Sequence, residues 1–244
     1  LPEPVSSRVR HGGFVRGAEL ADHAAFALSP AEAAAMDPCQ RLLLERGYAA
    51  LHAAALDRAA LGGSLAGVFV GFSGTASGQL PAASPAGASV YAATGASLSI
   101  ASGRLSYALG LHGPCASYDT ACSAALVACH AGLRALERAE CVDGLVAGVT
   151  LFLAPTTGTS FAVAGMTSAR GRSHTFDARA DGYARGEACG AAALRTSVGG
   201  KSSLLLLGSA LSWWDGLAPP SADMRPSQVA TRNRMREGLE IFSA

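Results

Sequence analysis

Apolar residues recur at helical spacing in three stretches of the chain, which predicts helical regions at residues 29–56, 94–111 and 123–140. In the first region, Ser29 can cap a helix that starts at Pro30, with Glu32 three residues after the cap. Pro38 then predicts a break between a short helix and a longer one. The second region is expected to end near Gly110 or Gly113, because glycine commonly follows a helix C-terminus.

Short apolar runs lie between and after these regions and predict strands. The predicted strands are residues 66–72, 117–121, 145–153, 189–195 and 203–211. The last two are expected to form an antiparallel hairpin, joined by the Gly-Gly of SVGGKS. Because strands alternate with helices, the pattern indicates an α/β layered architecture with one mixed sheet. The helix after residue 122 is expected to be buried between layers, because it is nearly all small and apolar through Gly132.

The remaining segments predict loops and one further helix. The predicted loops are residues 74–89, 164–187 and 215–228, and the helix is expected over 229–243. The segment 164–187 is rich in Gly, Arg, Asp and Ser, which is typical of a functional loop rather than of a core.

Composition and charge argue against several classes of protein. Half of the 244 residues are hydrophobic, 15% are charged and the net charge is +1. This balance predicts a globular domain with a large core, and neither a nucleic-acid nor an anionic-membrane partner. The longest apolar runs, 145–155 and 204–211, are shorter than the ~18 residues that span a bilayer. The opening residues show no apolar region of a secretory signal.

Cysteine usage points to a reducing environment. The 6 cysteines are scattered without CxxC pairs, so neither a zinc site nor a disulfide framework is expected. A reducing intracellular compartment fits best, either the cytoplasm or an organelle such as a plastid.

The candidate nucleophile, Cys122, lies in the segment YDTACSA (118–124), where a predicted strand runs into a predicted helix. A thiol at a helix N-terminus lies near backbone N–H groups and the positive end of the helix dipole, which favour negative charge. The Cys122 N–H can also point at the oxyanion that forms during acyl transfer. From these residues alone, the alternative that Cys122 is a small buried core residue stays open.

The run GPCASYDTACSAALVACHAGLRAL (113–136) resembles the active-site signature of β-ketoacyl synthases, especially those of modular polyketide synthases. Other stretches resemble the same family in the same order and cover nearly the whole chain. They are GGF (12–14), SPAEAAAMDPCQRLLLE (29–45), VFVGFSG (68–74), ATGASLSIASGRLSYALGLHGP (93–114), FDARADGYARGE (176–187), GSALSWWDG (208–216) and PPS…SQ (219–228).

The resemblance to these ketosynthases of the thiolase superfamily implies a thiolase-like layered αβαβα fold. The chain corresponds mostly to the N-terminal half of that fold, without its first strand and most of its C-terminal half. Residues 1–207 are expected to form the N-terminal ketosynthase half, and residues 208–244 the start of the C-terminal half.

The resemblance also implies a reaction in polyketide or fatty-acid biosynthesis that uses neither a metal nor another cofactor. Cys122 would take an acyl group from an acyl carrier protein, and a malonyl thioester would then condense with it after decarboxylation. The family's two histidines and lysine lie in motifs resembling GTGTxxGDxxE and KxxxGHxxxAAG, and neither motif occurs here. We therefore expect an acyltransferase family member that is inactive in condensation alone, as a piece of a longer protein or a shortened homologue.

Further residues receive supporting roles from the resemblance. Those expected to shape or support the pocket are Thr120, Met166, Phe176, Asp177, Asp181 and Glu187. Asp37 and Arg41 match a helix that packs over the fold and are expected to form a salt bridge or a cap pair.

Two other functions stay open at this point. A shortened thiolase-fold protein could be a non-catalytic scaffold or accessory subunit of a larger complex. A cysteine hydrolase with a local Cys–His pair would need only generic spacing. In the resembled family the strand before the nucleophile lies at a two-fold dimer interface. The expected partners are therefore a second copy or other subunits, and acyl carrier protein if the chain is active.

Overall fold

The computed structural model describes residues 1–73, 89–196 and 204–212, and within them five strands form one mixed sheet. The strands are β1 (Ala66–Phe72), β2 (Cys115–Tyr118), β3 (Asp143–Thr150), β4 (Ala188–Thr196) and β5 (Leu204–Ser212). They lie in the order β2-β1-β3-β4-β5. β1 pairs in parallel with β2 and β3, whereas the β3–β4 and β4–β5 pairs are antiparallel. The predicted mixed sheet and terminal hairpin are therefore confirmed.

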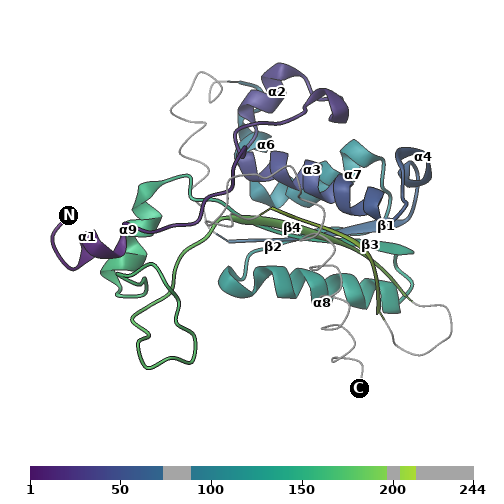
Figure 1. Ribbon diagram of the computed structural model, residues 1–244. Coiled ribbons are helices and arrows are strands. Elements are labelled where there is room, and N and C mark those ends of the chain that lie inside the picture. The colour runs from purple at the N-terminus through teal and green to yellow at the C-terminus, as the bar shows by residue number, and fades with distance from the viewer. Residues whose placement is uncertain (74–88, 197–203, 213–244) are drawn as a thin grey trace, which may run out of the picture.

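Helices cover both faces of this sheet (Figure 1). α3 (Pro38–Ala53) and α7 (Ala101–Leu109) pack on one face, and α8 (Ala124–Glu137) packs on the other. The shorter helices are α1 (Val5–Arg8), η1 (Ala24–Phe26), α2 (Pro30–Ala35), α4 (Arg58–Leu61), α6 (Ala92–Ala96), η4 (Leu98–Ile100), η5 (Ala121–Ser123) and α9 (Pro155–Val163). The predicted α/β layering is confirmed.

Successive side chains of β1 point to opposite faces of the sheet, so this strand contributes to the core on both sides. Val68 and Val70 point into the cluster under α3 and α7, and Phe69 points into the cluster under α8. The α3 side is filled mainly by leucines, each worth about 1.5–3 kcal/mol when fully buried. Leucines at most 2% exposed there are Leu42, Leu43, Leu44, Leu51, Leu61, Leu105 and Leu145.

Side-chain caps begin α2 and α3 where the prolines predict helix starts. Ser29 Oγ accepts a hydrogen bond from the Glu32 N–H at 3.1 Å, and Asp37 Oδ1 accepts one from the Cys39 N–H at 2.6 Å. Asp37 therefore caps α3, which was one of the two roles expected for it. Arg41 instead donates to the Glu19 carbonyl oxygen at 3.4 Å.

The predicted helix over 94–111 is wrong in its first half, which is divided into α6 and η4 before α7 begins. The buried Gln40 Nε2 donates to the carbonyl oxygens of Thr94, Gly95 and Ser97 at 3.1, 3.0 and 2.9 Å. These contacts use carbonyl groups that a continuous helix would bond internally. A long-range side chain therefore overrides the local helical pattern.

Two further expectations need correction. α8 is not buried between two layers of the described structure, because its face away from the sheet carries Leu126, which is 73% exposed. The small residues that suggested two buried faces serve the sheet-facing side alone. The sequence reasoning also missed α9, whose Thr and Gly residues have low helix propensity although Pro155 is well placed at its start.

Several predicted elements cannot be compared with the structure. The loops at 74–88 and 215–228, the hairpin turn at 197–203 and the helix at 229–243 lie outside the described residues. The expected domain boundary after residue 207 stays a prediction, although β5 runs through it.

Glycines bring α8 unusually close to the sheet. Gly71 of β1 and Gly148 of β3 are partners in the parallel register, and the start of α8 lies over both. A Cβ on Gly71 would lie 2.4 Å from the carbonyl carbon of Ala124, and one on Gly148 would lie 2.9 Å from Cβ of Ala125. The helix start can therefore take its position only because neither strand presents a side chain there.

We expect Gly71→Ala to lower the free energy of unfolding by about 1–3 kcal/mol or more, because its new methyl group meets helix backbone and not a movable side chain. Gly103→Ala is the matched control, since a Cβ there meets nothing within 4 Å. Within α7 that change should be neutral or stabilising by about 0.5–1 kcal/mol. Urea unfolding of both variants measures the difference, and equal effects would contradict the close approach.

Candidate active site at Cys122

Cys122 lies in the tight turn between β2 and α8. The predicted strand ends early, at Tyr118, because Ala121 has a φ of 53°, which is incompatible with a continuing strand. Asp119 Oδ1 accepts a hydrogen bond from the Ala121 N–H at 3.2 Å. Ser123 Oγ lies 2.8 Å from the carbonyl oxygen and 2.9 Å from Oγ1 of Thr120. These contacts hold a left-handed residue directly before Cys122.

The thiol of Cys122 differs from most of the other cysteines in its exposure. Cys122 and Cys115 are exposed, Cys129 is half-buried, and Cys39, Cys141 and Cys189 are buried. Cys122 is therefore not one of the buried core residues, which was the alternative that its sequence context left open.

Burial keeps the core thiols protonated. It raises the pKa of Cys189 to about 12, and it raises the pKa of Cys39 further, with the neighbouring Asp37 carboxylate adding to the effect. Burial also raises the pKa of Cys129 and Cys141. Because the thiolate is the reactive form of cysteine, these four are unsuited to nucleophilic chemistry.

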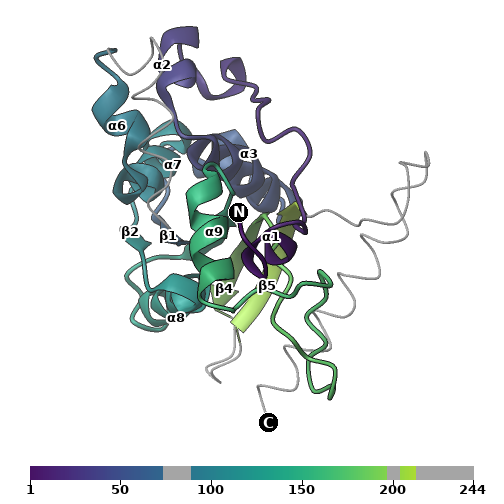
Figure 2. The same ribbon diagram turned by 90° about the vertical axis from the view of Figure 1, so that its left-hand side faces the viewer.

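The turn at Cys122 lies at the edge of the sheet where three strands end. β1, β2 and β3 are parallel, so their carboxyl ends meet at one edge, and β4 begins there opposite Thr150. The contact of Gly148 with Ala125 places the end of β3 next to the start of α8. Figure 2 looks onto this side of the molecule, with α9 in front of the sheet. Ligands of α/β sheets commonly bind at this edge.

Glu187 fixes the segments that meet at the same edge. Its carboxylate accepts hydrogen bonds from the Val15 N–H at 2.8 Å and the Phe152 N–H at 2.7 Å. Its own N–H donates to the Gly13 carbonyl oxygen at 2.8 Å. Glu187 therefore joins the N-terminal segment to the exit from β3.

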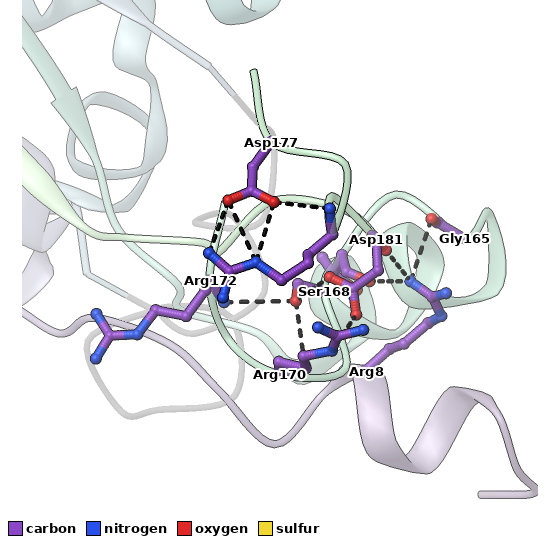
Figure 3. Close-up of polar contacts among 9 residues, drawn as sticks. Arg8, Gly165, Ser168, Arg170, Arg172, Asp177 and Asp181 are labelled. Atoms are coloured by element: carbon purple, nitrogen blue, oxygen red, sulfur yellow. Dashed lines mark hydrogen bonds and ion pairs between the residues drawn. The ribbon is translucent and has the colours of Figure 1, made fainter. Parts of the chain in front are cut away.

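A polar network holds the loop between α9 and β4 (Figure 3). Ser168 Oγ donates to Asp181 Oδ1 at 2.6 Å, and this hydrogen bond lowers the pKa of the Asp181 carboxyl, with Arg170 and Arg8 adding to the effect. The Arg8 guanidinium donates to the carbonyl oxygens of Gly165, Thr167 and Asp181, the first at 3.3 Å and the last at 2.9 Å. α1 is thus tied to a loop far from it in sequence.

The other predicted pocket residues lie closer to the surface. Arg179 forms two-pronged hydrogen bonds with Asp177 and lowers the pKa of that carboxyl to about 2. Phe176 is fully exposed and has a φ of 62°. Met166 is 45% exposed, and its carbonyl oxygen accepts a hydrogen bond from the Tyr183 N–H at 3.0 Å. Pocket roles for these residues stay predictions.

Sequence reasoning missed Arg185, whose guanidinium lies over two phenylalanine rings. Its Cζ atom is 4.4 Å from the ring centroid of Phe152 and 4.4 Å from that of Phe161. Phe152 also packs edge-to-face against Phe14, with ring centroids 6.1 Å apart. These rings are distant from residue 185 in sequence, so no local pattern indicates the cluster.

Across residues 1–73, 89–196 and 204–212, no group of three or more His, Cys, Asp or Glu could hold a metal ion. No helix in the same ranges has the length and apolarity to cross a membrane.

The layered sheet and the cysteine turn define the class of protein, a ketosynthase-type member of the thiolase-like fold. A family model described as "Beta-ketoacyl synthase, N-terminal domain" matches residues 2–198, and the chain belongs to that family. The resemblance noted from the sequence motifs is confirmed, and the matches favour a ketosynthase domain over an accessory subunit.

Polyketide synthases are prominent among the relatives. The chain is 43% identical over 187 residues to the spectinabilin polyketide synthase system protein NorC of Streptomyces orinoci, covering 77% of this chain and 8% of that protein. It is 40% identical over 233 residues to the erythronolide synthase EryA2 of Saccharopolyspora erythraea, covering 92% of this chain and 6% of that protein. The chain therefore spans less than a tenth of either relative.

Solved ketosynthase structures share the fold. The ketosynthase from module 6 of the bacillaene synthase from Bacillus subtilis 168 matches with a TM-score of 0.70 and 32% identity. The oxazolomycin ketosynthase domain of Streptomyces albus JA3453 matches with a TM-score of 0.69 and 30% identity. The matches cover 80% and 75% of this chain, and 32% of each of those chains. The expected correspondence to part of the thiolase-like fold is thus confirmed.

We expect the stability of the chain to fall as the pH rises above about 9, partly because of Cys189. Both states keep this thiol protonated below its unfolded pKa of about 8.5. Above that value only the unfolded thiol loses its proton, since the folded pKa is about 12. Each such group then lowers the free energy of unfolding by about 1.4 kcal/mol per pH unit.

Guanidinium unfolding at pH 8 and pH 10 tests this expectation. Cys189→Ala should reduce the loss of stability between the two values by about 1–2 kcal/mol. Cys115→Ala, at an exposed position, should lose as much stability as the unmodified chain. An unchanged loss in Cys189→Ala would show that the thiol ionises as readily in the folded state.

Proposed function

We propose that this chain supplies the acyl-accepting cysteine, Cys122, of a β-ketoacyl synthase in polyketide or fatty-acid biosynthesis. The observation that carries the proposal is the position of an exposed thiol in a strained turn, at the start of α8 and at the carboxyl edge of the sheet. Family membership and the ketosynthase structures support it.

The first step is thioester exchange. The Cys122 thiolate attacks the carbonyl carbon of an acyl thioester on a carrier protein, and a tetrahedral oxyanion forms. The C–S bond to the carrier then breaks, and the C–S bond to Cys122 remains. The carrier leaves as a thiolate, which takes up a proton in place of the one that the Cys122 thiol lost. The dipole of α8 and the Cys122 N–H favour the oxyanion, because both lie where the negative charge develops.

The left-handed backbone conformation of Ala121 is the source of strain in the turn. A non-glycine residue at this φ costs on the order of 1–2 kcal/mol, so surrounding contacts must hold it. Asp119 and Ser123 provide those contacts on either side. The Ala121 and Ser123 N–H groups donate to Asp119 and to the Thr120 carbonyl oxygen, and the Cys122 N–H between them is the donor that we assign to the oxyanion.

The second step, condensation, needs more than this chain provides. Decarboxylation of a malonyl thioester requires donors aimed at its carbonyl oxygen, and the family supplies them from motifs that do not occur in the 244 residues. The natural partners are therefore acyl carrier proteins together with further ketosynthase residues, in a larger assembly or a dimer.

We expect iodoacetamide to label Cys122 fastest of the 6 cysteines, and acyl N-acetylcysteamine thioesters to acylate it. Peptide mass mapping locates both modifications. Cys115→Ala is the matched control, because Cys115 is the other exposed thiol. Acylation should persist in that variant and disappear in Cys122→Ala, and faster labelling of any other cysteine would remove Cys122 as the nucleophile.

The same chain should produce no ketoacyl product on its own. Loss of one oxyanion donor typically costs about 10²–10³ in rate, and at least two family positions are missing here. Incubation with acyl- and malonyl-loaded carrier protein should release no carbon dioxide above the level of Cys122→Ala. Release above that level would show that residues within this chain perform the decarboxylation.

A further inference from the structure

The Arg185 guanidinium lies over two aromatic rings. Its Cζ atom is 4.4 Å from the ring centroid of Phe152 and 4.4 Å from that of Phe161. Its Nη1 atom is buried and has no hydrogen-bond partner among the described residues. Burial lowers the pKa of Arg185, yet a guanidinium remains protonated in proteins. The side chain is thus a cation stabilised chiefly by two ring faces.

This contact joins three separate segments of the chain. Phe152 lies in the exit from β3, Phe161 lies on α9, and Arg185 lies in the loop that leads into β4. A planar guanidinium can lie over aromatic rings and interact with both through its delocalised charge. Lysine carries the same charge as a compact, strongly hydrated ammonium group and cannot stack in this way.

The joined segments lie at the same sheet edge as Cys122. Phe152 follows the end of β3 at Thr150, and the end of β3 touches the start of α8 through Gly148 and Ala125. Phe152 therefore leaves the sheet at the edge where Cys122 lies, and α9, which carries Phe161, lies in front of the sheet on this side in Figure 2. A wall that must accept an apolar chain has to keep its rings fixed.

We propose that Arg185 is a positioning residue, which holds Phe152 and Phe161 as a fixed apolar wall and so determines how an acyl chain approaches Cys122. The proposal rests on the acyl-accepting role of Cys122. A charged side chain thereby orders an apolar surface through cation–π contacts and not through a salt bridge.

The chain offers a matched control at Arg58. Its Cζ atom lies 5.4 Å from the Phe26 ring centroid and 5.0 Å from that of Tyr48. This second stacked arginine begins α4, which precedes β1 and so lies toward the opposite edge of the sheet. Arg58→Lys disturbs the same kind of contact without touching the wall.

The experiment compares two maleimides on the 244-residue chain and its variants. N-methylmaleimide and N-hexylmaleimide react with the same thiol chemistry and differ only in the apolar tail. Peptide mapping gives the rate of each reagent at Cys122 and at Cys115, and the hexyl-to-methyl ratio reports tail binding beside each thiol. A general loss of stability would change both rates together and leave the ratio unmoved.

We expect the ratio at Cys122 to exceed that at Cys115 in the unmodified chain. Arg185→Lys should lower the Cys122 ratio about fivefold, which corresponds to about 1 kcal/mol of tail binding. Arg58→Lys should leave that ratio unchanged. In a Phe161→Leu background, Arg185→Lys should have little additional effect, because the arginine acts through that ring. If Arg185→Lys does not fold, Arg185→Gln serves instead, since its shorter amide cannot contact both rings.

Three results would overturn the proposal. They are equal ratios at Cys122 and Cys115 in the unmodified chain, an unchanged Cys122 ratio in the Arg185 variant, and an equal change in Arg58→Lys. Failure of the proposed function gives a different result, because thioesters would then not acylate Cys122 while the maleimide ratio still responded to Arg185.

Discussion

The close approach of α8 to the sheet is the constraint on which the site depends. Gly71 and Gly148 lie side by side in the register of β1 and β3, where a Cβ on Gly71 would meet the backbone of Ala124 and one on Gly148 would meet Cβ of Ala125. A side chain on either strand would displace the helix start. Because Cys122 lies two residues before Ala124, its position relative to the strand ends follows from these two glycines.

The framework around this turn is built largely from hydrogen bonds to backbone groups. Glu187 binds two N–H groups, Arg8 binds three carbonyl oxygens, and Gln40 binds three more in the segment from Thr94 to Ser97. These bonds hold the loops in place, because they satisfy backbone N–H and C=O groups that have no partner in a helix or a sheet. The loop between α9 and β4 consequently has a defined course at the sheet edge, with one isolated bridge from Gly186 to Gly13 and one inside the loop between Thr167 and Tyr183.

The sequence alone predicts the elements whose signals are local. The cap Ser29, the short apolar run of β1 and the cysteine between strand and helix all depend on neighbouring residues. What could not be predicted depends on partners distant in sequence. Gln40 breaks the expected helix over 94–111, and the rings that hold Arg185 come from two other segments. The burial of α8 was overestimated because small apolar residues indicate close packing without showing on how many faces.

Charged side chains at this site mainly hold the framework in place. The carboxylates of Asp181 and Glu187 accept hydrogen bonds from framework donors, and the Arg185 guanidinium lies over two aromatic rings. The negative charge of an acyl-transfer intermediate would therefore be met mainly by backbone N–H groups and the dipole of α8. A backbone donor cannot be removed by changing a side chain, so in the proposed function the position of the helix start, which Gly71 and Gly148 permit, determines where that donor lies.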